Sequence, residues 1–349
     1  MARVFLKVST GSCRKMVTMR RRTLLAGLAA TAGAGALTAC TAETDIGMSG
    51  ATTASASAAP ILASTTASSL AAQNVTAPYT PPPGTAPAGS FAVGKRVLQF
   101  SRGADRPVPT TVWYPAAGAA PSSPAPVDGA PAAAGRFPVV LFSHGLTSQP
   151  EDYAAMLSRW AQAGFVVAGP KYPRTSYGAA DFDALDIVNQ PLDASAVLDS
   201  LLALTDPLGA IIDPNRLAAA GHSGGGITTV GLFSAHRDER LKAGVVLAGT
   251  DFQGAPFTGP SAAMLFVHGR KDNTVTYRAG HTVFAAVPWS RAMLSITDGG
   301  HVTKAADFEA TTGTSTEFLR WALYGDSTAK ARVPAAAQTG EVATLETDL

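Results

Sequence analysis

Residues 219–227 read A-A-G-H-S-G-G-G-I, a stretch that sets one serine, Ser223, among four glycines. Two interpretations are open. The stretch is a flexible surface loop that happens to contain a serine, or it is a turn so tight that only glycine fits. Gly221, Ser223 and Gly225 match the pattern G-x-S-x-G, which by itself is weak evidence in a chain with 34 glycines. The residues on either side decide between the two.

The flanking sequence favours the tight turn. A leucine and three alanines before the motif suit a buried strand, and Ile227–His236 can form a helix. In a sharp strand-to-helix turn, side chains at the positions next to the serine would collide, so Gly221 and Gly225 are required. The turn places Ser223 at a helix N-terminus, where the amide of Gly224 points toward a developing oxyanion.

Strands and helices alternate on both sides of the motif. Apolar runs predict strands at 97–100, 110–114, 139–143, 165–169, 216–221, 243–249, 263–269 and 292–297. Helical spacing predicts helices at 153–161, 196–204 and 317–324, with Asp193 as a helix N-cap. The alternation predicts an α/β fold with a mostly parallel central sheet and helices on both faces. The short connection between Gly249 and Ala263 leaves no room for a large cap domain, so we expect an open site.

His301 is the candidate base for Ser223. It stands in T-D-G-G-H-V, directly after the last apolar strand, at the edge of the sheet where the strands end. An orienting acid is expected between Ser223 and His301 in sequence. Asp272, in V-H-G-R-K-D-N, and Asp251, in A-G-T-D-F, each follow a strand and both can reach that edge. The chain order Ser, Asp, His predicts a catalytic triad.

The loop after strand 139–143 is expected to complete the site. It reads S-H-G-L-T, and its backbone N–H at Leu146, together with that of Gly224, is the predicted oxyanion hole. We interpret His144 as a structural or pocket-wall residue and not as a metal ligand. The sequence contains no H-E-x-x-H and no Cys/His cluster with metal spacing, so we expect neither a metal nor a cofactor.

From about Phe91 to Tyr324 the chain resembles an α/β-hydrolase. It is similar to the branch that holds dienelactone hydrolases, platelet-activating-factor acetylhydrolases and bacterial cutinase-like polyester hydrolases. The matching stretches are R-P-V-P-T-T-V-W-Y-P, F-P-V-V-L-F-S-H-G-L, G-F-V-V-A-G-P, G-H-S-G-G, F-V-H-G-R-K-D and D-G-G-H-V. The resemblance implies a serine esterase that cleaves carboxylic esters through an acyl-enzyme intermediate. It also favours Asp272 as the acid, because H-G-x-x-D after this strand is the commoner arrangement there.

The chain departs from each member of that branch. Dienelactone hydrolases carry a cysteine where this chain has Ser223, and the acetylhydrolases take their acid after the earlier strand, which keeps Asp251 as an alternative. Cutinase-like enzymes have a large residue where Gly224 stands, and a late disulfide. These departures leave the identity of the ester substrate open, and short-chain esters, phospholipid acetyl esters and polyesters are the candidates. Two alternatives also remain, namely a peptidase or amidase on the same fold and an inactive tethered binding protein.

The first forty residues predict an export signal. Seven basic and no acidic residues accompany the apolar run Leu24–Leu37, which suits a signal-peptide core and is too short for a membrane span. Arg21-Arg22 resembles a twin-arginine signal, and L-T-A-C ending at Cys40 resembles a lipobox, which implies a lipidated Cys40. We expect a cell-envelope lipoprotein on the outer face of the membrane, or a secreted protein.

Composition divides the remainder into a tether of Ala, Ser, Thr and Pro over 41–90, the hydrolase domain over 91–328, and a loose tail over 329–349. The chain carries 27 Lys and Arg against 25 Asp and Glu. Without the seven basic residues of the signal, 20 Lys and Arg remain against 25 Asp and Glu, a formal net charge of −5. We therefore expect no nucleic-acid binding. The only cysteines are Cys13 and Cys40. Cys13 is removed with the signal, so we expect no internal disulfide in the mature chain. We expect a monomer that meets the membrane only through its lipid.

Overall fold

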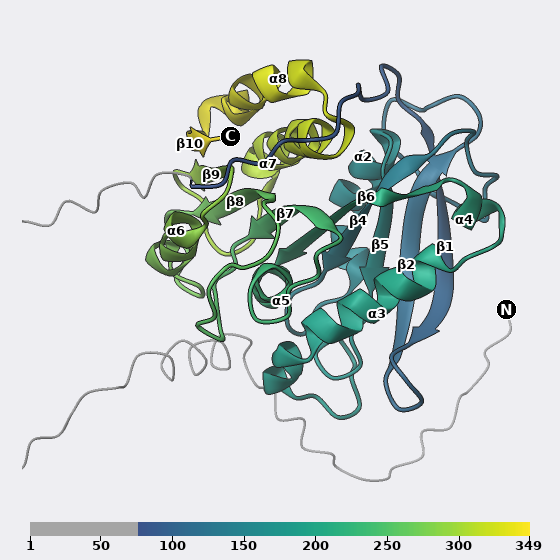
Figure 1. Cartoon of the computed structure of the whole chain (residues 1–349), viewed down its shortest axis with the longest axis horizontal. Helices are drawn as coiled ribbons and strands as arrows, with labels where there is room; N and C mark the ends of the chain where they lie inside the picture. The colour runs from purple at the N-terminus through teal and green to yellow at the C-terminus, as the bar shows by residue number, and fades with distance from the viewer. Residues whose placement is uncertain (1–75) are drawn as a thin grey trace, which may run out of the picture. The chain divides into compact units, whose positions relative to one another are not determined.

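The computed structural model of the protein describes residues 76–349, so the predictions for 1–40, including Cys40, and for 41–75 lie outside the described residues. A ten-stranded sheet runs through this part in the order β10-β9-β8-β7-β6-β4-β5-β2-β1-β3 (Figure 1). The strands are β1 (Ala92–Ser101), β2 (Pro107–Ala116), β3 (Val127–Asp128), β4 (Phe137–Ser143), β5 (Val166–Pro170), β6 (Ile212–His222), β7 (Leu241–Leu247), β8 (Ala263–Gly269), β9 (Arg291–Ile296) and β10 (Ala343–Asp348).

The six strands in the middle of the sheet are parallel. β5, β4, β6, β7, β8 and β9 pair in that order with parallel registers. β2 pairs antiparallel with β5 and β1 antiparallel with β2, and β10 closes the other edge antiparallel to β9. The predicted α/β fold with a mostly parallel sheet is confirmed. All six parallel strands end at the same edge, which collects the loops that follow them.

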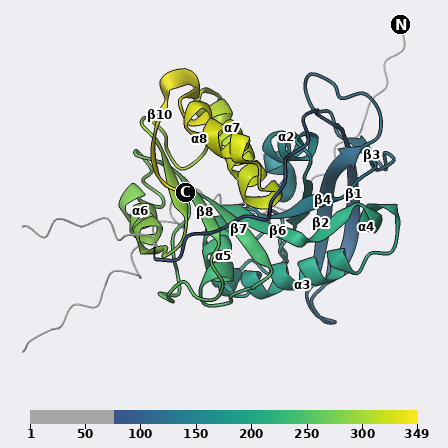
Figure 2. The same ribbon diagram turned by 45° about the horizontal axis from the view of Figure 1, so that its top comes forward.

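Helices cover both faces of the sheet, so each central strand is buried on both sides. Val139 and Leu141 of β4 pack into one apolar cluster, and the alternate residues Val140 and Phe142 pack into another. Figure 2 shows α2, α7 and α8 on one side of the sheet and α3 and α5 on the other. The helices are α2 (Ala154–Gln162), α3 (Gln190–Leu202), α4 (Pro207–Ala210), α5 (Gly224–Phe233), α6 (Tyr277–Ala286), α7 (Ala305–Leu319) and α8 (Ser327–Ala337), with short turns of other helix type at η1 (Pro150–Tyr153), η2 (Ala184–Val188), η3 (Arg320–Tyr324) and η4 (Thr339–Glu341).

The prediction of a loose tail over 329–349 is wrong. Ala329, Val333 and Ala337 recur every four residues along α8 and pack into the core with α7. Residues 343–348 then form β10, which covers the edge of β9 and satisfies its backbone hydrogen bonds. The few bulky side chains in this segment hid a helix whose small residues allow close packing.

Two further predictions need correction. Asp193 does not cap α3; the helix begins three residues earlier, and Asp193 lies fully buried within it, bound to Arg102 at 2.6 Å and to Arg106. The tether does not extend to residue 90, because residues 76–90 pack on the domain. Tyr79 is 8% exposed and its hydroxyl donates to the carbonyl of Ala322 at 2.9 Å.

The connection from β7 to β8 contains neither helix nor strand, in agreement with the expected absence of a large cap. Within residues 76–349, no helix combines the length and apolar character that a membrane crossing requires.

Candidate active site

The turn between β6 and α5 is as tight as its glycines predict. Ser223 has φ 56° and ψ −117°, a strained backbone for a residue with a side chain. A Cβ atom at Gly221 would lie 2.2 Å from the carbonyl oxygen of Gly225, and one at Gly225 would lie 1.9 Å from that of Ser143. The expectation that both glycines are required is therefore confirmed. The turn thus places Ser223 between the end of β6 and the first residue of α5, as a strand-to-helix serine turn requires.

Three residues from three loops meet at this turn. Nε2 of His301 lies 2.8 Å from Oγ of Ser223, and Nδ1 of His301 lies 2.8 Å from Oδ2 of Asp272. Ser223 follows β6, Asp272 follows β8 and His301 follows β9, so the residues meet because these parallel strands end at one edge. Ser223 is 4% exposed and the imidazole of His301 13% exposed, so the pair is shielded yet reachable.

Asp272 is held as an ionised acceptor. Its Oδ1 accepts the backbone N–H groups of Thr274 at 2.8 Å and Val275 at 3.0 Å. Oδ2 receives His301 and lies 3.3 Å from Nε2 of His268. Burial acts to raise the pKa of this carboxyl, but the hydrogen bonds from His268 and His301 and the charge of His301 outweigh it, and the pKa lies well below its ordinary value. The carboxylate is thus charged at neutral pH.

Asp251, the alternative acid, is engaged elsewhere. Its Oδ1 accepts the backbone N–H of Gln253 at 2.9 Å, a local turn contact. Among the described residues, neither His301 nor any other histidine binds its carboxylate. β8 lies directly beside β9, which leads to His301, whereas β7, which leads to Asp251, is one strand further away. In this structure the carboxylate that contacts His301 is therefore that of Asp272.

The two expected oxyanion donors lie close together. The amide nitrogen of Leu146 is 3.3 Å from the position of a Cβ at Gly224, and the side chains of Leu146 and Ile187 approach the same point at 3.1 Å. No acceptor within residues 76–349 takes the amide proton of Leu146 or of Gly224. Gly224 begins α5, so its amide also carries the positive end of the helix dipole. Both N–H groups are available to a negative oxygen beside Ser223.

His144 is a structural residue. It is 1% exposed, its Nδ1 donates to the carbonyl of Gly145 at 2.8 Å, and its Nε2 accepts the backbone N–H of Tyr172 at 3.2 Å. Burial lowers the pKa of His144 to about 4. The ring is neutral at physiological pH and ties the loop that carries Leu146 to the residues after β5.

Sequence reasoning missed three residues that contact this site. His268 lies 3.3 Å from Oδ2 of Asp272, the same oxygen that His301 contacts. His222 and Tyr153 bind each other at 2.9 Å, and Nε2 of His222 also contacts the carbonyl oxygen of His301 at 2.7 Å. The position of His222 beside Ser223 in the motif was the one available signal, whereas nothing around Tyr153 marked it.

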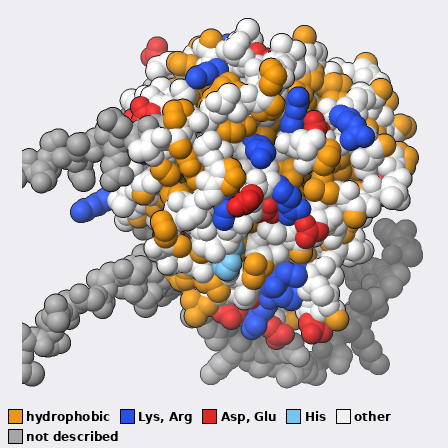
Figure 3. Space-filling view, in the orientation of Figure 1, with side chains coloured by type: hydrophobic (Ala, Val, Ile, Leu, Met, Phe, Trp, Pro, Cys, Tyr) orange, Lys and Arg blue, Asp and Glu red, His pale blue; other side chains and the backbone are white. Residues whose placement is uncertain are grey.

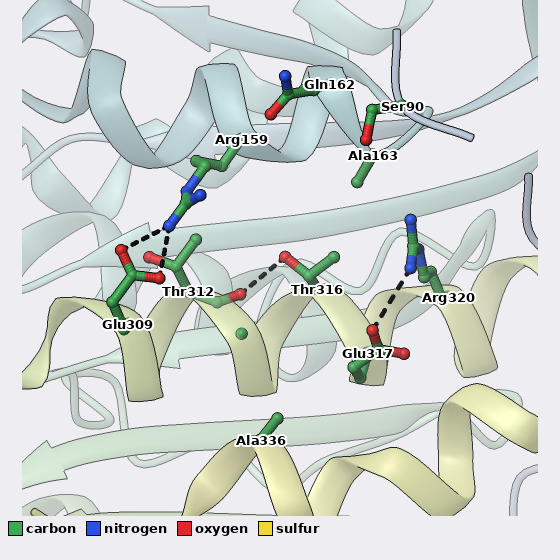
Figure 4. Close-up of a pocket in the computed structure, with 11 residues that line it drawn as sticks. Ser90, Arg159, Gln162, Ala163, Glu309, Thr312, Thr316, Glu317, Arg320 and Ala336 are labelled. Carbon is green, nitrogen blue, oxygen red and sulfur yellow. Dashed lines mark hydrogen bonds and ion pairs between the residues drawn. The ribbon is translucent and has the colours of Figure 1, made fainter. Parts of the chain in front are cut away.

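A polar cavity of about 260 Å³ lies between α2 and α7, away from these residues (Figure 4). Its arginines are compensated within the chain, since Arg159 pairs with Glu309 at 2.5 Å and Arg320 with Glu317 at 3.4 Å. Basic and acidic side chains are likewise interspersed on the face shown in Figure 3. In the described part of the chain, no cluster of three or more His, Cys, Asp or Glu side chains has metal-binding geometry.

Comparisons with known proteins agree with the fold. The model of the chlorophyllase family matches residues 97–260. The solved structure of a ferulic acid esterase from Streptomyces cinnamoneus is similar with a TM-score of 0.51 and 21% sequence identity, over 62% of this chain and 76% of the esterase. No curated protein sequence matches the chain significantly. The mostly parallel sheet and the similarity to this esterase structure show the α/β-hydrolase fold, and the match to the chlorophyllase family over 97–260 agrees with it.

Proposed function

We propose that the protein is a carboxylic ester hydrolase that works through Ser223, His301 and Asp272. The observation that carries the proposal is the continuous line of two 2.8 Å hydrogen bonds from the serine hydroxyl through the imidazole to a buried carboxylate. The similarity to the chlorophyllase family and to the fold of a ferulic acid esterase supports cleavage of an ester bond.

The geometry suits a two-step acyl transfer. His301 Nε2 takes the proton of Ser223 Oγ as the oxygen attacks the ester carbonyl, and the negative oxygen formed receives the N–H groups of Leu146 and Gly224. His301 then gives its proton to the departing alcohol, which leaves an acyl group on Ser223. Water, deprotonated by His301, attacks that acyl carbon and releases the acid and the free serine hydroxyl. Asp272 keeps the proton of His301 on Nδ1 throughout.

We infer a lipase- or cutinase-like enzyme with an open, apolar approach to the serine. Tyr177, Phe182 and Leu185 are 60%, 38% and 59% exposed, and they lie on the segment between β5 and α3 that also brings Ile187 to Gly224. We propose that this segment supplies an apolar wall of the substrate site, because Ile187 reaches the serine turn and three side chains earlier in the same segment are apolar and exposed. A bulky, short-chain or polymeric hydrophobic ester fits such a site better than a long acyl chain that needs a closed tunnel.

The test is a substrate panel with the purified protein. We expect hydrolysis of nitrophenyl esters of short acids and of polyester film, no cleavage of aminoacyl amides, and stable labelling by a fluorophosphonate. Ser223→Ala abolishes both hydrolysis and labelling, whereas Ser200→Ala, which removes a hydroxyl bound only within α3, leaves both intact. Cleavage of amides in preference to esters would favour the peptidase alternative. A labelled band that survives Ser223→Ala would refute the nucleophile.

We also propose that the protein is exported and anchored through lipid on Cys40. The acid-free leader and the lipobox carry this proposal. A single acyl chain holds a protein on a membrane only marginally, but the two or three chains of a bacterial lipoprotein hold it firmly. Cys40→Ala is expected to move the protein from the membrane fraction to the soluble fraction. A wild-type protein that is soluble and begins at another residue would contradict the proposal.

A further inference from the structure

The imidazole of His222, outside the triad, connects the loop that carries Leu146 with the loop that carries His301. His222 ends β6 directly before Ser223 and is 9% exposed. Its Nε2 lies 2.7 Å from the carbonyl oxygen of His301, and its Nδ1 lies 2.9 Å from the hydroxyl of Tyr153. That hydroxyl also accepts the backbone N–H of Gly145 at 3.2 Å. Gly145 immediately precedes Leu146, so the chain of bonds runs from the oxyanion loop to the histidine loop.

The partners determine where the protons lie. A carbonyl oxygen can only accept, so Nε2 of His222 carries a proton and donates it to His301. Nδ1 of the neutral ring is then an acceptor and receives the hydroxyl proton of Tyr153. The Tyr153 oxygen keeps a lone pair for the N–H of Gly145. Each group thus has one role, and no polar atom in the chain of bonds is left without a partner.

Neutrality of His222 matters for the neighbouring ring. The centroids of the His222 and His301 rings are 5.0 Å apart. Burial, and then the proximity of His301, lower the pKa of His222 to about 4. The tyrosine side also contributes no charge, because burial raises the pKa of Tyr153 and keeps its hydroxyl protonated. His301 can therefore become positively charged during the reaction without a second cation beside it.

We propose that His222 and Tyr153 are positioning residues, which hold the backbone of His301 and the loop of Gly145 and Leu146 in register with Ser223. The assignment rests on the proposed function. Neither side chain touches the reacting atoms. Each acts through the backbone of a residue that does, because the imidazole of His301 and the N–H of Leu146 move with their own main chains. The space is tight, since a Cβ at Gly145 would lie 3.2 Å from the Tyr153 hydroxyl and 3.3 Å from Nδ1 of His222.

Three variants separate positioning from bulk packing. Tyr153→Phe removes one oxygen and leaves the ring that packs on Phe142 at 4.7 Å. His222→Leu removes both hydrogen bonds and keeps an apolar group in the space. His222→Gln restores a donor and an acceptor at the end of the side chain. The matched control is Tyr79→Phe, because Tyr79 is also a buried tyrosine bound to a backbone carbonyl, at 2.9 Å from that of Ala322 on another side of the fold.

The experiment measures kcat, KM, the rate of fluorophosphonate labelling and amide hydrogen exchange of the full-length protein. Misplacement of a catalytic group by about 1 Å costs on the order of 100-fold in rate. We expect His222→Leu and Tyr153→Phe to lower kcat by about 10- to 100-fold with KM nearly unchanged, and to speed exchange in peptides that cover residues 144–148 and 299–303. His222→Gln restores most of kcat, and Tyr79→Phe leaves kcat at the wild-type level. Because the two residues act in one chain of bonds, the double variant His222→Leu/Tyr153→Phe is no slower than His222→Leu alone.

Folded variants with unchanged kcat, or a glutamine variant as slow as the leucine variant, would overturn the proposal. If His222→Leu fails to fold, Tyr153→Phe decides, since it deletes a single atom. If the wild-type protein cleaves no ester, the proposed function fails, and the labelling and exchange rates of the same variants still decide whether His222 positions the two loops.

Discussion

Replacing Asp272 by asparagine is the sharpest test of how the site works, because the structure determines which way the new amide must face. Oδ1 of Asp272 accepts two backbone N–H groups, from Thr274 and Val275. In Asp272→Asn the amide oxygen is expected to remain there, since an NH2 group would face two backbone donors at 2.8 and 3.0 Å, whereas His268, near the other oxygen at 3.3 Å, makes its shorter hydrogen bond to the carbonyl of Val275 at 2.8 Å. The NH2 group then takes the place of Oδ2, 2.8 Å from Nδ1 of His301.

That orientation changes the tautomer of His301. Facing a donor, Nδ1 of His301 has to accept, so the ring proton moves to Nε2. Nε2 lies 2.8 Å from Oγ of Ser223 and can no longer take its proton. The same substitution in serine proteases lowers turnover by about four orders of magnitude. Because the hydrogen-bond pattern around Asp272 enforces the same tautomer, we expect kcat to fall about 10⁴-fold, or about 5.4 kcal/mol of activation free energy.

The assay is hydrolysis of a nitrophenyl ester of a short acid, with circular dichroism to verify that the variant is folded. Asp251→Asn is the matched control, since Asp251 also follows a strand and also accepts a backbone N–H from two residues onward. The control is expected to keep most of the activity. If Asp272→Asn stays folded and retains more than about a tenth of wild-type kcat, the argument from the tautomer is wrong. Loss of activity in the control alone would move the acid to the earlier strand.

Three further outcomes follow from the packing. Gly225→Ala is expected to prevent folding or to lower the melting temperature strongly, because its Cβ would lie 1.9 Å from the carbonyl oxygen of Ser143; a melting curve like that of the wild type would contradict the fixed turn. The pKa values of His144 and His222 lie at about 4, below the 6.5 of an unfolded histidine. As the pH falls, the unfolded state therefore binds protons at these two residues before the folded state does. The free energy of unfolding is expected to decrease between about pH 6.5 and pH 4, by about 3 kcal/mol at most for each residue. Urea unfolding at pH 7 and pH 4.5 measures this, and equal stability at both values would show that the two rings are not buried neutral. Deleting residues 327–349 exposes the edge of β9 and part of the core. The shortened protein is expected to aggregate, which size-exclusion chromatography detects. A monomeric product as stable as the wild type would mean that α8 and β10 contribute nothing to the fold.

Much of the fold could be predicted from the sequence because its signals are local. A doubly buried strand such as β4 shows as a continuous apolar run, and the turn at Ser223 shows as glycines where a side chain has no room. Segments whose packing relies on small residues escaped this reasoning. α8 and β10 contain few bulky side chains, and Asp193 looked like a helix cap because its arginine partners, Arg102 and Arg106, lie some ninety residues earlier in the chain.

The candidate site divides in the same way. The residues alone predict a tight serine turn, a histidine after the last parallel strand and two aspartates in suitable loops. Only the folded chain shows which aspartate contacts His301, because Asp272, which follows β8, lies 2.8 Å from Nδ1 of His301. The tertiary structure alone also brought Tyr153 to His222, and His222 to the carbonyl of His301. These contacts join residues 69 and 79 positions apart in the chain. A hydrogen bond depends on distances of a few tenths of an ångström, and for residues so far apart those distances are set by the order and packing of the strands, which no local pattern of side chains specifies.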